Sequence, residues 1–467
     1  MAQITPAVKS LADTDIQAFA KGFEGQLLTS DSSGYDEARS IWNAMIDKRP
    51  RFIARCKSVD DIVQALRFAK SHGLTIAVRG GGHNIAGNAL VDDGMVIDLS
   101  QMKEINVDLA TATATVQPGA TLADFDAATQ AHGMATPTGI NSTTGIAGLT
   151  LGGGFGWISR RFGLTIDNLL EAQLVTATGE IVKASETENP DLFWGIRGGG
   201  GNFGIATSFK YKLHKLGPEI LSGLIVHPIA DARKVLEFYR EFTQTLPDDV
   251  TVWVVMRKAP PLPFLPEEWH GKEVLVLAVA CAGDPTAAEK TIKPLRDFGS
   301  PIADVIGMNP FTGWQQAFDP LLTAGMRNYW KSHDFSDLPD DFIDVVLGAV
   351  GTLPSPHTEI FIGQMGGATS RVPADATAYY DRTMKFVMNV HGRWETAAED
   401  RAGTEWCRAV FDAAKPYSTG GGYVNFMTAD ESDRVQSAYG KSYDRLVELK
   451  RKYDPNNVFR VNQNIKP

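Results

Sequence analysis

The stretch Arg79-Gly80-Gly81-Gly82-His83-Asn84 decides how the first half of this 467-residue chain is expected to fold. Three successive glycines carry no Cβ atoms, so the backbone can approach a bulky anionic ligand and point its N–H groups at it. Apolar residues on either side, 74–78 and 95–98, predict two buried strands. The sequence therefore predicts a ligand-binding turn between strands, followed directly by a histidine.

Composition and charge narrow the class of protein. The chain is 43% hydrophobic and 21% charged, which is typical of a soluble globular protein, and it is long enough for two domains. Its net charge of −10 argues against a nucleic-acid partner. Residues 1–6 do not begin a signal peptide and no stretch is long enough to span a membrane, so we expect a cytoplasmic protein without a membrane partner. Three widely spaced cysteines predict neither a disulfide framework nor a metal site.

Two more glycine-dense loops follow, at 152–156 and 198–204. One such loop usually marks only a tight turn. Each glycine, however, lowers the stability of the folded chain by about 1 kcal/mol relative to alanine. Three such loops in one region therefore indicate a ligand long enough to contact all of them. Residues 199–204 match the dinucleotide fingerprint Gly-x-Gly-x-x-Gly. They follow a helix-like segment and lead into a strand, whereas the fingerprint follows a strand and opens a helix, so a Rossmann NAD site is rejected. The P-loop motif of nucleotide hydrolases is absent from the sequence.

The pattern changes near Gly217-Pro218, after which glycine clusters become rarer. We interpret the following segment as a second domain, built on an antiparallel sheet with helices on one side. The segments expected to be strands are 250–256, 273–281, 359–362 and 384–390, and those expected to be helices are 233–245, 342–347 and 398–414. Residues 430–452 are expected to form one long helix.

Further motifs accompany the three glycine loops. They are Gly139-Ile140-Asn141-Ser142-Thr143-Thr144-Gly145, Arg160-Arg161-Phe162-Gly163-Leu164-Thr165-Ile166-Asp167-Asn168, Asn189-Pro190-Asp191-Leu192-Phe193-Trp194 and Tyr453-Asp454-Pro455-Asn456-Asn457-Val458-Phe459. Their order resembles the berberine bridge enzyme-like branch of the vanillyl-alcohol oxidase superfamily, which includes sugar oxidases and 6-hydroxy-D-nicotine oxidase. The motifs cover residues 43–215 and 416–467, about half of the chain.

The resemblance implies an α+β protein with a two-subdomain FAD-binding fold of the PCMH type. Residues 1–215 would form the FAD-binding domain, residues 216–415 a substrate domain of antiparallel sheet flanked by helices, and residues 416–467 a C-terminal segment that completes the FAD-binding domain. It also implies that FAD is bonded covalently to His83. The residues expected to bind FAD are Arg79, Gly80, Gly81, Gly82, His83, Asn84, Gly139, Asn141, Thr144, Gly145, Gly148, Gly153, Gly204, Ile205, Asn462 and Asn464.

One position departs from the family members that hold FAD through two bonds. Those members carry a cysteine where this chain has Asn141. A carboxamide cannot form the thioether, so we expect a single covalent link, through His83. The absence of a second link favours smaller substrates over large glycans.

Three residues are candidates for catalysis. Tyr423 is expected beside the flavin on the substrate side, in a strand that would place Tyr423 and Asn425 on one face, although a tyrosine that only packs its ring is an equally good interpretation. Asn389 resembles the polar residue that assists the base in related enzymes. Thr144 stands where the family controls the access of oxygen, and its valine-like shape favours an oxidase; the alternative is that it only caps a turn.

The substrate domain carries two further expectations. In the nicotine-derivative oxidase, charged residues line the strand that corresponds to Thr358, Ile360 and Ile362, and the absence of charge at these positions argues against the same amine substrate. Some of the tryptophans of this domain could stack on a sugar or aromatic substrate, although most tryptophans are packing residues. They are Trp253, Trp269, Trp314, Trp330 and Trp394.

The functional hypothesis is an FAD-dependent oxidase. Hydride from an alcohol, sugar or amine C–H would pass to the flavin, and O2 would reoxidise the flavin to give H2O2. Two alternatives stay open: a dehydrogenase that uses another electron acceptor, and a flavin-holding binding protein without turnover.

Overall fold

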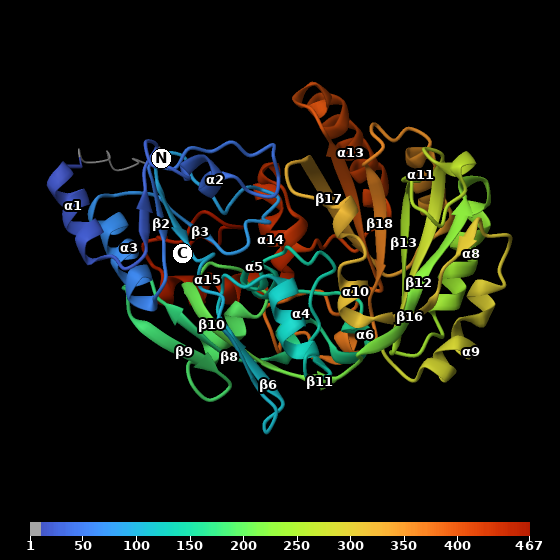
Figure 1. The fold of residues 1–467 in the computed structure, drawn as a ribbon, viewed down its shortest axis with the longest axis horizontal. Coiled ribbons are helices and arrows are strands. Elements are labelled where there is room, and N and C mark those ends of the chain that lie inside the picture. The colour runs from blue at the N-terminus through green and yellow to red at the C-terminus, as the bar shows by residue number, and fades with distance from the viewer. Residues whose placement is uncertain (1–10) are drawn as a thin grey trace.

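The computed structural model describes residues 11–467, which form four β-sheets in two halves (Figure 1). Residues 1–6, on which the expectation about a signal peptide rests, lie outside the described residues. Three smaller sheets and the C-terminal helices make up one half, and one eight-stranded sheet with its helices makes up the other.

The first sheet places the triple-glycine loop at its edge. Its strands run in the order β1-β2-β4-β3, with β3 and β4 parallel, and the loop follows the last residue of β3. Helix α3 covers this sheet and begins after Ser58, whose hydroxyl accepts from the Asp61 N–H. The elements are α1 (Asp13–Gly22), β1 (Gln26–Leu28), α2 (Tyr35–Arg39), β2 (Phe52–Arg55), α3 (Val59–Ser71), β3 (Ile76–Arg79) and β4 (Met95–Asp98).

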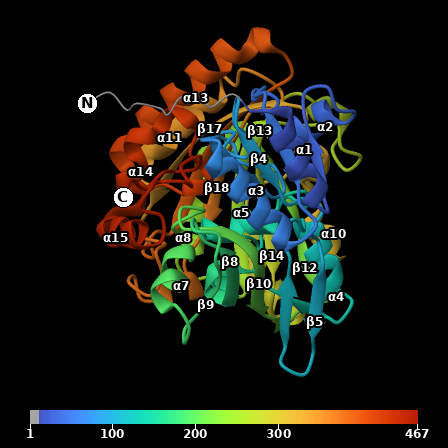
Figure 2. The same cartoon turned by 90° about the vertical axis from the view of Figure 1, so that its left-hand side faces the viewer.

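The second sheet is antiparallel, in the order β5-β6-β10-β8-β9 (Figure 2). Its strands are β5 (Ile105–Asp108), β6 (Thr113–Val116), β8 (Leu169–Val175), β9 (Ile181–Ser185) and β10 (Ile205–Lys212). A capping box starts α4, where the side chains of Thr121 and Asp124 each accept from the other's backbone N–H. Helices α4 (Leu122–Gln130), α5 (Ile146–Leu151), α6 (Ser159–Phe162) and α7 (Pro190–Ile196) connect these strands, and β7 (Met134–Ala135) pairs with β11 (His214–Lys215).

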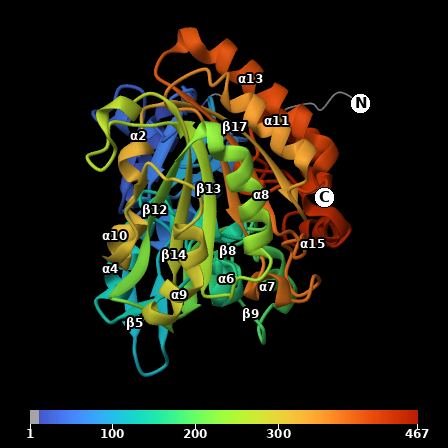
Figure 3. The same cartoon turned by 90° about the vertical axis from the view of Figure 1, so that its right-hand side faces the viewer.

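The eight-stranded sheet is antiparallel throughout and has helices on one face. Its order is β15-β12-β14-β13-β18-β19-β17, with β16 beside β12. The strands are β12 (Glu219–Pro228), β13 (Val250–Lys258), β14 (Glu273–Cys281), β15 (Ala303–Asp304), β16 (Gly307–Pro310), β17 (Arg327–Phe335), β18 (Glu359–Gln364) and β19 (Phe386–Trp394). Figure 3 shows α8 (Ala232–Thr243), α9 (Pro285–Arg296), α11 (Asp340–Val350) and α13 (Asp400–Ala414) over its outer face.

Alternate residues of these strands face the helices and form the largest apolar core. Val254, Met256, Ile360, Met388 and Val390 belong to it. Burying one such side chain contributes about 1.5–3 kcal/mol. The other face of the sheet turns toward the first half, and the short helix α10 (Phe311–Gln315) packs against part of it. The predicted fold class, an α+β protein with a large antiparallel sheet flanked by helices, is confirmed.

The C-terminal segment returns to the first half, but not as the single long helix predicted for residues 430–452. It is broken into short pieces, η8 (Ala429–Arg434), α14 (Val435–Tyr439), η9 (Gly440–Ser442) and α15 (Tyr443–Tyr453). Gly440 has a φ of +48°, and an added Cβ would lie 2.4 Å from the Tyr380 ring. The backbone must leave the helical conformation there to pass this ring, which hydrophobic periodicity does not reveal.

One buried lysine ties the last helix to the third glycine loop. Lys450 Nζ donates to the carbonyls of Asn202 and Phe459, both at 2.8 Å, and to Asp454 at 2.7 Å. The side chains of Lys450 and Asp454 are fully buried. Because all three N–H groups of the ammonium are satisfied, the charge is tolerated inside the protein.

A buried arginine joins the two halves. Arg160, on α6, donates to the carbonyls of Val250 at 2.9 Å, Met365 at 2.6 Å and Leu246 at 3.1 Å, which all belong to the other half. These bonds hold the inner face of the large sheet against the glycine loops. No helix within residues 11–467 is both long and apolar enough to cross a membrane.

Replacing Lys450 with methionine is expected to lower the free energy of unfolding by about 3–5 kcal/mol, because the Asp454 carboxylate stays buried without its counter-charge. Lys452→Met is the matched control, since Lys452 pairs with Asp191 at the exposed surface and its loss is expected to cost less than about 1 kcal/mol. Urea unfolding followed by circular dichroism measures both values. Equal losses in the two variants would contradict the role given to Lys450.

Candidate functional site

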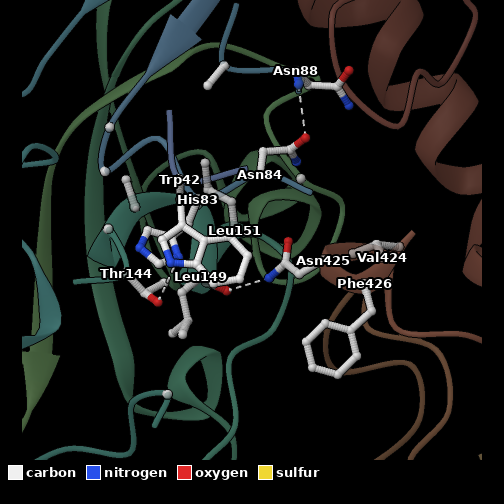
Figure 4. A pocket seen from close by; sticks show the side chains of 18 of the residues that line it. Trp42, His83, Asn84, Asn88, Thr144, Leu149, Leu151, Val424, Asn425 and Phe426 are labelled. Atoms are coloured by element: carbon white, nitrogen blue, oxygen red, sulfur yellow. Dashed lines mark hydrogen bonds between the residues drawn. The ribbon is translucent and has the colours of Figure 1, made fainter. Parts of the chain in front are cut away.

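A cavity of about 360 Å³ lies between the glycine loops and the inner face of the eight-stranded sheet. Its wall comes from loops of the first half, from the C-terminal segment and from strands β13, β17, β18 and β19. Figure 4 shows Trp42, His83 and Thr144 gathered together, with Asn425 and Phe426 farther along the wall. The wall is mostly apolar and aromatic, which suits a planar organic ligand.

Gly81 and Gly145 let two loops touch backbone to backbone. A Cβ added to Gly81 would lie 2.4 Å from the nitrogen of Gly145, and one added to Gly145 would lie 2.4 Å from the nitrogen of Gly81. No side chain fits at such distances. The contact places His83 beside Thr143 and Thr144.

The hydrogen bonds of His83 define which ring nitrogen carries the proton. The Thr143 hydroxyl donates to Asn141 Oδ1 at 2.6 Å, so its oxygen accepts from His83 Nε2 at 2.8 Å. This leaves the lone pair on Nδ1, 3.5 Å from Thr144 Oγ1. Trp42 stacks on the imidazole with ring centroids 5.1 Å apart. Burial lowers the pKa of His83 to about 3, so the ring is neutral near pH 7 and Nδ1 is able to form a bond to carbon.

Two glycines of the wall have no explanation in the packing of the protein. Gly148 lies inside α5 and Gly201 lies in the loop before β10, and neither has a positive φ. A Cβ added to either would meet nothing within 4 Å among residues 11–467. A glycine inside a helix costs about 1 kcal/mol relative to alanine. The space beside these main-chain atoms is therefore open to a ligand, which is what bound FAD requires.

The C-terminal segment adds a polar group to the same wall. Asn462 Nδ2 donates to the carbonyls of Gly201 and Phe459, both at 3.1 Å. Its Oδ1 is buried and has no partner within the described chain. Since a buried oxygen without a hydrogen bond is costly, this atom is available to a ligand donor. Main-chain N–H groups, an open strip of glycines and this free acceptor together fit FAD.

Most of the residues expected to bind FAD lie in the cavity wall. They are Gly80, Gly81, Gly82, His83, Asn84, Gly139, Asn141, Thr144, Gly145, Gly148, Gly204, Ile205 and Asn462. The candidates for catalysis, Tyr423, Asn389 and Thr144, line it too.

Arg79, Gly153 and Asn464 are not part of the wall. The Arg79 guanidinium donates to the carbonyl of Ala38 instead. Gly153 has a φ of +128°, and an added Cβ would lie 2.7 Å from the Tyr379 ring, so packing inside the protein requires this glycine. Asn464 lies beside Ile465, whose N–H donates to Asn202 in the core. A glycine-rich or Asn-rich motif does not by itself distinguish packing from ligand contact.

Tyr423 precedes a 3-10 turn, η7 (Val424–Phe426), and the predicted strand over 423–426 is wrong. Residues on a 3-10 turn do not alternate between faces, yet Asn425 Nδ2 donates to the Tyr423 hydroxyl oxygen at 2.9 Å. The Gly154 N–H donates to the same oxygen at 3.0 Å. Burial raises the pKa of Tyr423 to about 12, so it keeps its proton near pH 7. The Tyr423 O–H has no acceptor among residues 11–467, so it can donate to a ligand.

The face of strand β18 that lines the cavity is the opposite of the one expected from the sequence, which was the face of Thr358, Ile360 and Ile362. Ile360 and Ile362 lie in the apolar core under the helices, whereas Glu359 and Phe361 line the cavity. A shift of one residue along a strand exchanges its two faces, which explains the error. The strand therefore does present a charged side chain, Glu359, to the cavity. The sequence-based argument against an amine substrate assumed that this strand carried no charge, so that argument fails.

Neighbouring strands extend this cavity face into two rows. In one row, Val255, Phe361 and Asn389 are cross-strand partners. Asn389 Oδ1 is buried without a partner in the described chain. In the other row, Arg257, Glu359, His391 and Trp330 lie side by side on β13, β18, β19 and β17. Sequence reasoning missed Glu359 and His391, although they stand two residues from Phe361 and Asn389 and alternation would have placed them on the same face.

Aromatic residues form much of the remaining wall. Of the tryptophans considered from the sequence, Trp253 and Trp330 line the cavity, Trp269 and Trp314 do not, and Trp394 lies in the helix-covered core. Trp42 and Trp157, which were not considered, line it as well. Cys56, Cys281 and Cys407 are buried in other cores and do not line it. Among residues 11–467, no three His, Cys, Asp or Glu side chains are placed to hold a metal ion.

Comparisons with known proteins place this chain among flavoproteins. Residues 50–185 match the family model of an FAD binding domain, and residues 422–466 match the model described as berberine and berberine like. The chain is 31% identical over 457 residues to an FAD-linked oxidoreductase of Dictyostelium discoideum, covering 97% of each chain. It is 30% identical over 470 residues to (R)-6-hydroxynicotine oxidase of Paenarthrobacter nicotinovorans, covering 95% of this chain and 97% of that one.

Solved structures agree with this placement. The 6-hydroxy-D-nicotine oxidase of Arthrobacter nicotinovorans superimposes with a TM-score of 0.84 at 29% identity, covering 95% of this chain and 98% of that one. The xylooligosaccharide oxidase of Myceliophthora thermophila, solved with xylobiose, gives a TM-score of 0.85 at 25% identity and covers 97% and 99%.

Gly148→Ala is expected to lose FAD while the protein without FAD becomes no less stable. The added methyl meets no protein atom and removes a helix penalty of about 1 kcal/mol, but it occupies the space left for the ligand. Gly348→Ala is the control, because Gly348 also lies inside a helix with nothing within 4 Å but outside the cavity wall. The flavin-to-protein absorbance ratio and thermal unfolding measure both effects. Full flavin content in Gly148→Ala would contradict the fit to FAD.

Proposed function

This chain belongs to the berberine bridge enzyme-like family of FAD-linked oxidoreductases, and on that premise we propose that it is an oxidase of a small organic substrate. The observation that carries the proposal is a single cavity in which open main chain, a neutral histidine and the inner face of the large sheet meet. Bound FAD supplies a hydride acceptor for a substrate C–H bond.

The glycine loops would hold FAD and His83 would bond it covalently. Neutral His83 keeps an unprotonated Nδ1 beside Thr144, and Trp42 fixes the plane of the imidazole by stacking. Asn141 donates to the carbonyl of Leu322 and cannot form a thioether. One covalent link is therefore proposed, and the site is proposed to take an alcohol, a sugar or an amine of modest size.

Other residues of the cavity wall would orient the substrate and exclude water. Tyr423 would donate its O–H to a polar atom of the substrate and orient it; with its pKa near 12 it is a poor proton acceptor at neutral pH. Asn389, which also lines the cavity, offers an unpartnered amide oxygen. Aromatic side chains exclude water around the reacting C–H bond.

O2 is proposed as the electron acceptor, with H2O2 as the product. Thr144 lies in the wall beside His83 and has a short, branched side chain. A residue of this size leaves room for O2 next to the cofactor, where a longer side chain would fill that room.

His83→Ala is expected to release the yellow colour from the polypeptide on acid precipitation, because no other residue of the wall is proposed to bond the flavin. His132→Ala, which removes an exposed histidine, is the control and should keep the colour in the pellet, as in the parent protein. Absorbance of the supernatant measures the result. Flavin that stays bound in His83→Ala would show that the linkage is elsewhere.

Thr144→Leu is expected to slow the oxidation of the reduced flavin by O2, because the longer side chain fills the approach to the cofactor. Thr144→Val, which keeps the size, should react at nearly the parent rate. Stopped-flow mixing of dithionite-reduced protein with O2 measures both rates without a substrate. An equal rate in the leucine variant would refute the gate, and slow oxidation in the parent protein would point to a dehydrogenase instead of an oxidase.

A further inference from the structure

A chain of hydrogen bonds connects Asn141 to the ring of His83. His83 Nε2 lies 2.8 Å from Thr143 Oγ1, and Thr143 Oγ1 lies 2.6 Å from Asn141 Oδ1. The main-chain N–H of Thr143 donates to the same Oδ1 at 3.1 Å. Asn141 therefore reaches the histidine through one intervening hydroxyl.

The direction of each bond is set by a carbonyl of the other half of the molecule. Asn141 Nδ2 donates to the carbonyl of Leu322 at 3.2 Å, so the amide cannot turn over and Oδ1 faces Thr143. Because an amide oxygen only accepts, Thr143 has to donate to it, and the Thr143 oxygen is left to accept from Nε2–H. The proton of a neutral His83 is thereby held on Nε2, and the lone pair is held on Nδ1.

The other tautomer of His83 has a competing partner. Within residues 11–467, Thr143 is the hydrogen-bond partner of Nε2, whereas Nδ1 has Thr144 Oγ1 at 3.5 Å. Without the bond to Thr143, the ring gains a hydrogen bond by moving its proton to Nδ1 and donating to Thr144. That tautomer has no lone pair on Nδ1, so it cannot form a bond to carbon there. The Thr143 hydroxyl therefore decides which nitrogen of His83 is reactive.

The same carbonyl holds the second group that orients the imidazole. Leu322 O also accepts from Trp42 Nε1 at 2.9 Å, and Trp42 stacks on His83 (Figure 4). Trp42 thus restrains the plane of the ring, while Asn141 restrains the position of its proton. One main-chain oxygen supports both restraints.

We propose that Asn141 and Thr143 are positioning residues for the attachment of FAD, because they hold His83 in the tautomer whose Nδ1 bonds the flavin. This inference rests on the proposed single covalent link through His83. Where the family members with two links carry a cysteine, this chain has a residue that acts on the first link instead of forming a second.

The hydrogen-bond chain fits the chemistry of the attachment. Nδ1 of His83 gives its lone pair to a bond with a methyl carbon of the flavin ring, and one C–H bond of that methyl group breaks. The electron pair of this C–H bond passes through the flavin to O2, which also takes the C–H proton and the Nε2 proton and leaves as H2O2. Nε2 then carries a lone pair, to which the Thr143 hydroxyl can turn and donate. Asn141 Oδ1 keeps the main-chain N–H of Thr143 in both arrangements.

Thr143→Val tests the hydroxyl. A valine methyl takes the place of the hydroxyl, so Nε2 loses its acceptor and water gains no room beside it. Full-length protein made in riboflavin-starved cells is mixed with FAD in air, and samples are precipitated with acid over time. We expect yellow colour to enter the pellet about tenfold more slowly than in the parent protein, as for the loss of one hydrogen bond from a buried donor. Thr143→Ser, which restores a hydroxyl, is expected to restore the rate.

Asn141 has its own pair of variants. Asn141→Leu keeps the size of the side chain but removes the acceptor, and we expect a similar slowing. Asn141→Asp keeps an acceptor for the Thr143 hydroxyl and should attach FAD faster than the leucine variant. Ser142→Ala is the matched control, because the Ser142 hydroxyl bonds Asp319 and takes no part in the chain to His83. Its N–H keeps a bond of 2.9 Å to Asp319, so the control is expected to attach FAD at the parent rate.

Quenching of FAD fluorescence, measured before precipitation, separates slow attachment from weak binding. Parent-like rates in both Thr143→Val and Asn141→Leu would overturn the proposal, and so would equal slowing in Ser142→Ala. If one of the two test variants does not bind FAD, the other decides. Loss of FAD binding in both, with normal binding in the control, would assign these residues to binding and also overturn the proposal. A parent protein whose pellet stays colourless would instead show that the proposed covalent link itself is wrong.

Discussion

The backbone contact between Gly81 and Gly145 is the constraint on which the site depends. Neither loop can carry a Cβ at this point without meeting the other's nitrogen at 2.4 Å. Because the loops touch, the residues that follow Gly81 reach those that precede Gly145, and His83 is held between the two threonines. The same approach brings the main chain of α5, with Gly148, into the cavity wall. One close contact between glycines thus positions both His83 and the open strip beside it.

The second requirement is that the large sheet meets these loops in one position. Arg160 donates to three carbonyls of the other half, and Arg382 bonds Asp167 through two contacts of 2.8 Å. Both arginines are buried, so the penalty for leaving them unpaired is large and the halves do not part easily. This geometry turns the inner face of the sheet, opposite its four long helices (Figure 3), toward the glycine loops. A cavity enclosed by both halves excludes water from the reacting atoms.

The electrostatics of the cavity follow from the pleat of that sheet. Residues of β18 alternate, so Ile360 packs under the helices while Glu359 faces the cavity. Cross-strand pairing then sets Arg257 and His391 on either side of Glu359. A single row of neighbouring strands therefore gathers an ion pair, a neutral imidazole and a tryptophan. Tyr423, with its pKa near 12, contributes a donor rather than an acceptor to this arrangement.

The sequence by itself determined the local features: the strands 273–281 and 95–98, the family motifs, and the expectation of His83 beside a glycine loop. These depend on neighbours along the chain, where side-chain periodicity and backbone freedom act directly. Only the tertiary structure decided which face of β18 meets the cavity, why Gly153 belongs to packing, and where the helix over 430–452 breaks at Gly440. The pairing of Glu359 with His391 was equally beyond sequence reasoning, because strand register is set by contacts between segments far apart in the chain.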